Sequence, residues 1–220
     1  MKTKIDKKSC CVLTITLILL ISLLVNVFLN LSNSKYKIEI GQDAYKSIEE
    51  IRTRNESILI VLDGCLASKS ITKEEILTLY KNYNLIDIAE LNLWEHYLKD
   101  MENTIFEKKT DTLFECKNEV FSDIEELVYT TLLNYMGDSC DKIELDEDLS
   151  NDMYVMREIS RDLNDYFDNF TENNLQGLEG EERAEKIIKK KYWADMLKGI
   201  EQINYRYKDY MFKKELLNNQ

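Results

Sequence analysis

The stretch that decides the fold is CCVLTITLILLISLLVNVFLNL, residues 10–31, in which no side chain is charged. As an α-helix it spans about 33 Å, which matches the hydrocarbon core of a bilayer at about 30 Å. This run predicts a transmembrane helix that binds the membrane through residues 10–31. A cleaved secretory signal is the alternative, but its apolar region usually covers only about 7–15 residues. Ser32 and Ser34 also make a poor cleavage site.

Lysines on either side of this run predict its orientation. Four lysines lie in the nine residues before it, whereas three are spread over the nineteen residues after it. Because positive residues favour the cytoplasmic side of a membrane, the short N-terminal tail is expected inside the cell. The chain is therefore predicted to be a single-pass protein of the cell membrane, with its C-terminal part outside the cytoplasm.

Three polar residues of the run recur every four positions. Ser22, Asn26 and Asn30 would share one stripe of the transmembrane helix, where such groups can hydrogen-bond to a second helix. A homodimer is one interpretation of this stripe. The other is that Asn30 reaches the membrane interface and that Ser22 bonds to its own backbone.

The composition of the remaining sequence favours long helices. None of the 220 residues is proline, and only six are glycine. Proline breaks helices and punctuates loops, so its absence suits helices joined by short turns.

Helical periodicity recurs in five blocks after residue 40. In the first, expected over about residues 41–66, apolar positions follow 3-4 spacing at Ile48, Ile51, Asn55, Ile58, Leu62 and Cys65. The second begins at Thr72, where the TKEE sequence forms a capping box with Glu75. The third block ends near Gly137, and the fourth runs from Leu149 to Phe170. The fifth is expected to run from Gly180 to about Leu217 without a break. Apolar residues of the second block are Ile76, Tyr80, Tyr83, Leu91, Trp94, Tyr97, Met101 and Ile105.

The predicted fold class is all-α: an N-terminal transmembrane helix followed by an antiparallel bundle of about five helices. No block has the alternation of a strand. The predicted organisation is a basic cytoplasmic tail at 1–9, a signal-anchor helix at 10–31, a juxtamembrane linker at 32–40 and an acidic helical extracytoplasmic domain at 41–220.

Charge excludes one class of partner. The net charge is −12, and the first nine residues contribute a side-chain charge of +3, which leaves −15 on the rest. Nucleic-acid binding needs a basic surface that replaces the counterions of phosphate, so no nucleic acid is expected as a partner.

No motif for catalysis, a metal or a cofactor stands out in the sequence. His96 is the only histidine, and zinc sites and catalytic dyads commonly need that residue together with partners. The acid-rich stretch from Asp138 to Asp152 lacks the ordered oxygen spacing of an EF-hand. The simpler interpretation is a solvated loop whose negative charges interact favourably with the N-terminus of the fourth helix. Accordingly, the sequence predicts no enzyme and no cofactor.

One pair of cysteines is placed to form a disulfide. In an up-down-up arrangement Cys65 ends the first bundle helix and Cys140 follows the third, so both would lie at the same end of the bundle. Outside the cytoplasm a bond between them is conceivable. The alternative is that the domain's three cysteines, Cys116 included, stay free and buried.

These features predict a membrane-anchored helical binding or scaffold protein of the cell envelope, with a protein partner. The anchor fixes its location, and the helices offer side-chain surfaces. The alternative is an envelope hydrolase or inhibitor-type factor acting on cell-wall polymers, which the many carboxylates would serve. A pocket with two carboxyls of raised pKa would favour the alternative, and an exposed apolar surface would favour binding.

Overall fold

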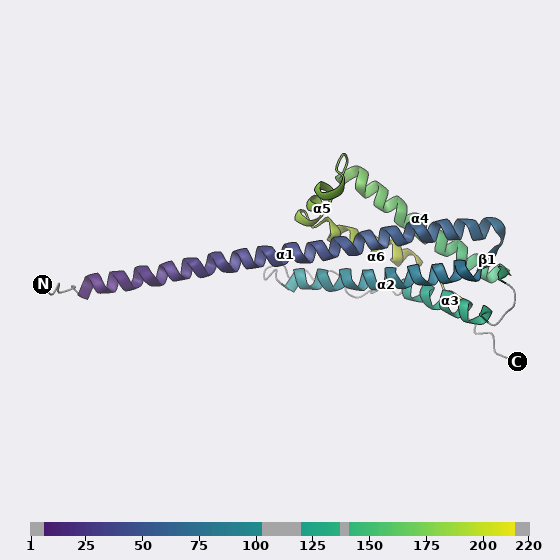
Figure 1. Ribbon diagram of the computed structural model, residues 1–220, viewed down its shortest axis with the longest axis horizontal. Helices are drawn as coiled ribbons and strands as arrows, with labels where there is room; N and C mark the ends of the chain where they lie inside the picture. Colours follow the sequence, from purple (N-terminus) through teal and green to yellow (C-terminus); the bar gives the residue numbers. More distant parts are fainter. Residues whose placement is uncertain (1–6, 103–119, 137–140, 214–220) are drawn as a thin grey trace. The chain divides into compact units, whose positions relative to one another are not determined.

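The computed structural model describes residues 7–102, 120–136 and 141–213. The chain divides into two compact units, Met1–Ile40 (unit 1) and Gly41–Gln220 (unit 2). Helices make up most of the described residues (Figure 1), which confirms the predicted all-α fold with a helical bundle.

In unit 1 the described residues belong to helix α1, which runs from Lys7 to Ser68 and continues into unit 2. Every side chain from Val12 to Leu31 is exposed. By length and composition this part of α1 can cross a membrane, and none of its apolar window is buried against protein. The core helix of a water-soluble protein would be buried, whereas an N-terminal signal sequence meets the same criteria.

The expected linker at 32–40 is part of this helix. The sequence predicts a helix start at about residue 41, but α1 passes through residues 32–40 without a break. That stretch contains neither proline nor glycine, the residues that most often end a helix. Lys35 Nζ also lies 3.7 Å from Glu39 Oε1, one turn further on.

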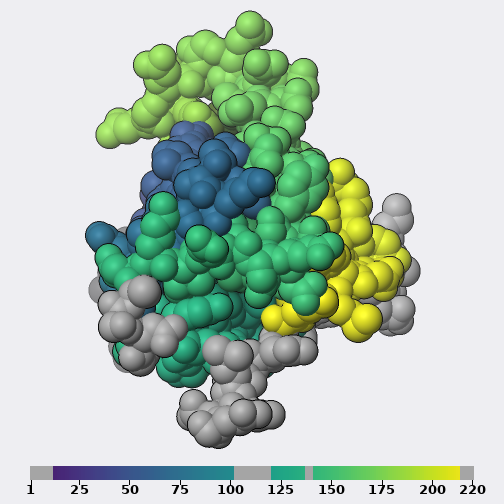
Figure 2. All heavy atoms as spheres, turned by 90° about the vertical axis from the view of Figure 1, so that its right-hand side faces the viewer, coloured from purple at the N-terminus to yellow at the C-terminus, as the bar shows by residue number. Residues whose placement is uncertain are grey.

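Among the described residues of unit 2, five further helices follow the part of α1 that lies beyond Ile40. They are α2 (Lys73–Glu102), α3 (Val120–Tyr135), α4 (Glu147–Asn174), α5 (Gly180–Lys189) and α6 (Tyr192–Tyr207). Figure 1 shows α2 folding back beside α1. At the end of unit 2 seen in Figure 2, α4 in green lies between the blue end of α1 and the yellow C-terminal residues.

The second half of α1 carries the seam on which unit 2 is assembled. All six positions predicted to face a partner helix are buried: Ile48, Ile51, Asn55, Ile58, Leu62 and Cys65. Because 3-4 spacing keeps one stripe turned inward, α1 remains packed for about five turns. Beside this seam, Arg54 Nη1 is 3.5 Å from Asn82 Oδ1 of α2, and Arg157 Nε of α4 is 2.8 Å from Asp63 Oδ1.

Two helix starts depend on capping side chains. The capping box predicted at Thr72 is confirmed: its backbone N donates to Glu75 Oε2 at 2.7 Å, and Glu75 N donates to Thr72 Oγ1 at 3.2 Å. At α4 the N-cap is Asp146, whose carboxylate accepts from Leu149 N at 2.8 Å.

A short β-ribbon joins two of the connections between the predicted helical blocks. Ser70–Thr72 (β1) pairs antiparallel with Lys142–Glu144 (β2), and Ile71 faces Ile143. Three residues are too few for alternation to be recognised in a sequence. Part of the acidic stretch before α4 is therefore ordered as β2, and it ties the α1–α2 turn to the start of α4.

The last predicted helix is two helices. Instead of running on from Gly180 to about Leu217, the chain ends α5 at Lys189 and starts α6 at Tyr192. Lys191 between them has a φ of 56°, a left-handed conformation that ends a helix. Its ammonium lies 2.5 Å from Asp100 Oδ2 at the end of α2, which holds the break in place. α6 ends at Tyr207, and Leu217 lies outside the described residues.

The buried stripe of α2 is also only partly as predicted. Ile76, Tyr83 and Tyr97 are buried, but Leu91 is 41% exposed. Leu93, which the predicted stripe omitted, is buried in its place. The mismatch arises because α2 has apolar residues on two sides.

We expect Leu62→Ala to lower the free energy of unfolding by about 2–5 kcal/mol, because it leaves a cavity in the seam of α1. Leu62 is 0% exposed, whereas Ile60 on the same helix is 75% exposed. The matched control Ile60→Ala should change stability by no more than about 0.5 kcal/mol. Urea unfolding of the full chain in detergent, followed by circular dichroism, measures both. Equal losses for the two variants would refute the assignment of the seam.

Candidate functional site

Of the two cysteines predicted to pair, only Cys65 lies among the described residues. It is a buried free thiol at the end of the seam, and its burial raises the pKa of the thiol to about 12. A thiol held in this form is a poor nucleophile. Cys140 and Cys116 lie outside the described residues, so the disulfide stays a prediction.

His96, the histidine singled out in the sequence, lies half-buried on α2. Burial lowers the pKa of its imidazole, which favours the neutral form. Among the residues that the structure describes, no three His, Cys, Asp or Glu side chains gather to hold a metal ion.

An acidic pocket is the part of unit 2 that most resembles a catalytic cleft. It has a volume of about 140 Å³ and lies between α3, the first turns of α4 and Lys213. Asp152 lines the pocket and is only 2% exposed, and this burial raises the pKa of its carboxyl. Asp146 and Asp148 also line the pocket.

The carboxylates of this pocket are already engaged. Asp152 accepts a hydrogen bond from the Tyr210 hydroxyl at 2.8 Å and another from Lys213 N at 3.2 Å. Lys213 Nζ lies 2.5 Å from Asp148 Oδ1, and Asp146 caps α4. Ligand pockets usually enclose about 300–1,000 Å³, so this one is small. The contacts of its carboxylates with Tyr210 and Lys213 fasten the residues after α6 to the start of α4.

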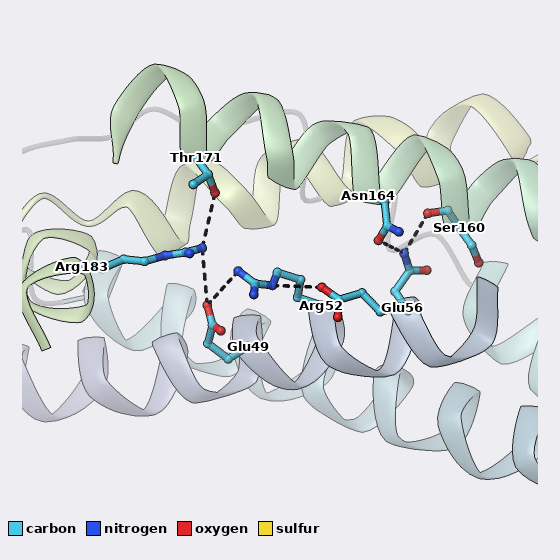
Figure 3. A network of polar contacts seen from close by, with 8 residues as sticks. Glu49, Arg52, Glu56, Ser160, Asn164, Thr171 and Arg183 are labelled. Carbon is cyan, nitrogen blue, oxygen red and sulfur yellow. Dashed lines mark hydrogen bonds and ion pairs between the residues drawn. The ribbon is translucent and has the colours of Figure 1, made fainter. Parts of the chain in front are cut away.

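A polar network between α1, α4 and α5 is likewise structural (Figure 3). Asn55 Nδ2 donates to the Ser160 carbonyl and to Asn164 Oδ1, both at 2.8 Å. Further along the helices, Arg183 of α5 lies between Glu49 of α1 and Thr171 of α4. These contacts hold the three helices in register.

The exposed apolar side chains of unit 2 are concentrated on one helix pair. Among its described residues, ten large hydrophobic side chains are exposed, and six of these lie on α2, on α3 or directly after α3. We define the α2/α3 face by these six: Leu77, Ile88, Leu91, Tyr129, Leu133 and Met136. Single exposed hydrophobic residues are normal, but a group of them marks an interaction surface.

Two contacts join α2 and α3 beside this face. The rings of Tyr80 and Tyr129 are 5.4 Å apart, and Asn84 Nδ2 donates to Glu125 Oε1 at 2.9 Å. The later position on α2 pairs with the earlier one on α3, so the helices are antiparallel. Leu77 therefore lies level with the last turn of α3, and Ile88 lies level with its first turn.

The α2/α3 face could have been found in the sequence by looking for a second stripe. On α3, Tyr129, Leu133 and Met136 follow i, i+4, i+7 spacing. This stripe lies opposite the buried stripe of Ile124 and Leu127. A search for one buried stripe per helix missed it, and on α2 it assigned Leu91 to the core.

The described residues thus define an all-α protein, a helical bundle joined to an apolar N-terminal helix that can cross a membrane. Comparison with protein-family models, curated proteins and solved structures gave no significant match to the chain.

We expect Asp152→Asn to flatten the pH dependence of stability. Because the pKa of Asp152 lies above its ordinary 3.8, the folded chain holds a proton that the unfolded chain has already released. The contribution of this group to the free energy of unfolding is therefore fully present below pH 3.8 and decreases as the pH rises through the folded pKa. Without the titrating carboxyl, this decrease should be absent.

Urea unfolding at a series of pH values from 3.5 upward measures the effect. Asp209→Asn, which alters an exposed carboxyl two residues beyond the end of α6, is the control and should leave the slope unchanged. A slope that stays the same in Asp152→Asn would contradict the assigned burial of this carboxyl.

Proposed function

We propose that this chain is a membrane-anchored helical binding or scaffold protein of the cell envelope, and that its α2/α3 face binds a protein partner. The observation that carries the proposal is the concentration of exposed apolar side chains on one helix pair. A folded domain gains nothing by leaving such residues in water, whereas an interface buries them.

In this proposal residues 10–31 anchor the chain as a single transmembrane helix that is not cleaved. Residues 1–9 stay in the cytoplasm because of their four lysines, and residues 41–220 lie outside the cytoplasm. Anchoring confines the chain to the envelope, which raises the local concentration of the α2/α3 face for a partner in the same compartment.

Self-association through the anchor is compatible with this role. Ser22, Asn26 and Asn30 are exposed along one stripe of α1 and can hydrogen-bond to the same stripe of a second copy. Such a homodimer would present two α2/α3 faces and raise the avidity for a partner with repeated sites.

The second candidate is an envelope hydrolase or inhibitor-type factor acting on cell-wall polymers. The acidic pocket favours it, since Asp152 is a buried carboxyl with a raised pKa. Hydrolysis of a glycosidic bond usually uses two carboxyl groups, one as acid and one as base or nucleophile. In this pocket Asp148 is paired with Lys213 and Asp146 caps a helix, which supports binding over catalysis.

Site-specific photocrosslinking in cells of the native host tests the proposed function. A p-benzoylphenylalanine at Ser122, an exposed residue of α3 near Ile88, reports on the α2/α3 face without removing any of its apolar side chains. We expect irradiation to yield a discrete adduct with a second protein. The control is the same probe at Thr53, an exposed position on α1, which should give no such adduct.

The proposal fails if the Ser122 probe yields no adduct, or if Thr53 yields the same one. An adduct at twice the mass of the chain would identify self-association through this face, in place of a different partner.

A further inference from the structure

We infer that the partner segment bound by the α2/α3 face is a basic amphipathic helix of another protein. This inference rests on the proposed function, which it deepens by naming the chemistry of the partner. Three features carry it: the charge of the two helices, the spacing of the apolar side chains, and the length of the face.

The charge of α2 and α3 selects a basic occupant. α2 contains three lysines and seven carboxylates, and α3 adds three carboxylates without any lysine or arginine. Glu90 and Asp100 of α2 are buried and bonded to residues outside α2, so the remaining eight carboxylates and three lysines give a net charge of −5. Within this set Glu126 is exposed on α3, one turn before Tyr129, and Glu125 lies at the junction of the two helices. Glu74 is exposed on α2, one turn before Leu77. Carboxylates therefore border the apolar residues.

The same charge argues against other occupants. A second copy would bring a net charge of −5 against −5, and an anionic lipid or wall polymer would also be repelled. Lys81 is the one exposed lysine near the middle of α2, and the net charge of α2 and α3 is negative with this lysine included. A partner with lysine or arginine around an apolar stripe gains attraction from both parts of the face.

The spacing of the apolar residues indicates a helix. Tyr129, Leu133 and Met136 form a ridge at i, i+4 and i+7, and Leu77, Ile88 and Leu91 lie on the neighbouring helix. Two such helices side by side accept a third whose apolar residues recur every three or four positions. The fourteen residue steps from Leu77 to Leu91 span about 21 Å, which a partner helix of about 15 residues would match.

The test uses the full chain in nanodiscs of zwitterionic phosphatidylcholine, with p-benzoylphenylalanine at Ser122. Two synthetic peptides of about 15 residues carry leucines at the same i, i+3 and i+4 positions. One peptide has lysine at its polar positions, and the other has glutamate. Because the probe reports only on its own surroundings, peptide that partitions into the lipid does not contribute to the signal.

We expect the lysine peptide to give at least about tenfold more adduct than the glutamate peptide. Raising the salt from about 0.05 to 0.5 M should reduce this adduct severalfold, because the attraction is screened. Leu133→Ser should also reduce it severalfold, whereas Ile60→Ser, which removes an exposed side chain from α1, should not. A probe at Thr53 should give at most a tenth of the adduct.

Equal adduct from the two peptides, or adduct that Leu133→Ser leaves unchanged, would overturn the inference. The proposed function fails separately. If the Ser122 probe captures a protein in cells while the lysine peptide gives no adduct, the face binds a partner but not a basic helix. If it captures nothing in cells, the binding function itself is wrong.

Discussion

The structure of unit 2 depends on the buried seam of α1. Its positions are spaced three and four residues apart from Ile48 to Cys65, so one side of the helix stays turned inward over its length. Asn55 lies in the middle of this seam and is almost completely buried, and its Nδ2 donates two hydrogen bonds to α4. Its bonds to Ser160 and Asn164 of α4 therefore fix which turn of α4 faces which turn of α1. A slip along the helices would break both hydrogen bonds of the buried Asn55 Nδ2 group.

How much the sequence could predict depended on the length of each pattern. The seam of α1 and the capping box at Thr72 were predictable, because each expresses a local rule that the rest of the fold does not override. The break at Lys191 was not, since the apolar pattern continues across it and the ion pair with Asp100 joins residues far apart in the chain. The pairing of Ile71 with Ile143 is another long-range contact, and its strands are too short to leave a pattern.

The candidate site was harder to predict than the fold for a physical reason. Periodicity identifies a buried stripe when a helix has one apolar side, but α2 and α3 each have apolar residues on a second side. Which side of α2 faces the core is decided by its contacts with α1 and α6, and which side of α3 does so is decided by its contacts with α2 and α4. Leu91 shows the difficulty, because its spacing suits the buried stripe although its side chain is exposed. A helix with two apolar sides is itself a signal that one of them serves an interface.

Helix α1 belongs to both units, and in this account its two parts have different surroundings: lipid around the first part and protein around the second. From Val12 to Leu31 the side chains of α1 are apolar or uncharged and exposed, which suits lipid, while the seam beyond residue 44 is closed by protein. Extraction of native membranes with alkaline carbonate tests this most directly, because it strips peripheral proteins and leaves integral ones in the pellet. The account predicts that the full-length chain stays in the pellet. Recovery of the full-length chain in the supernatant would contradict it.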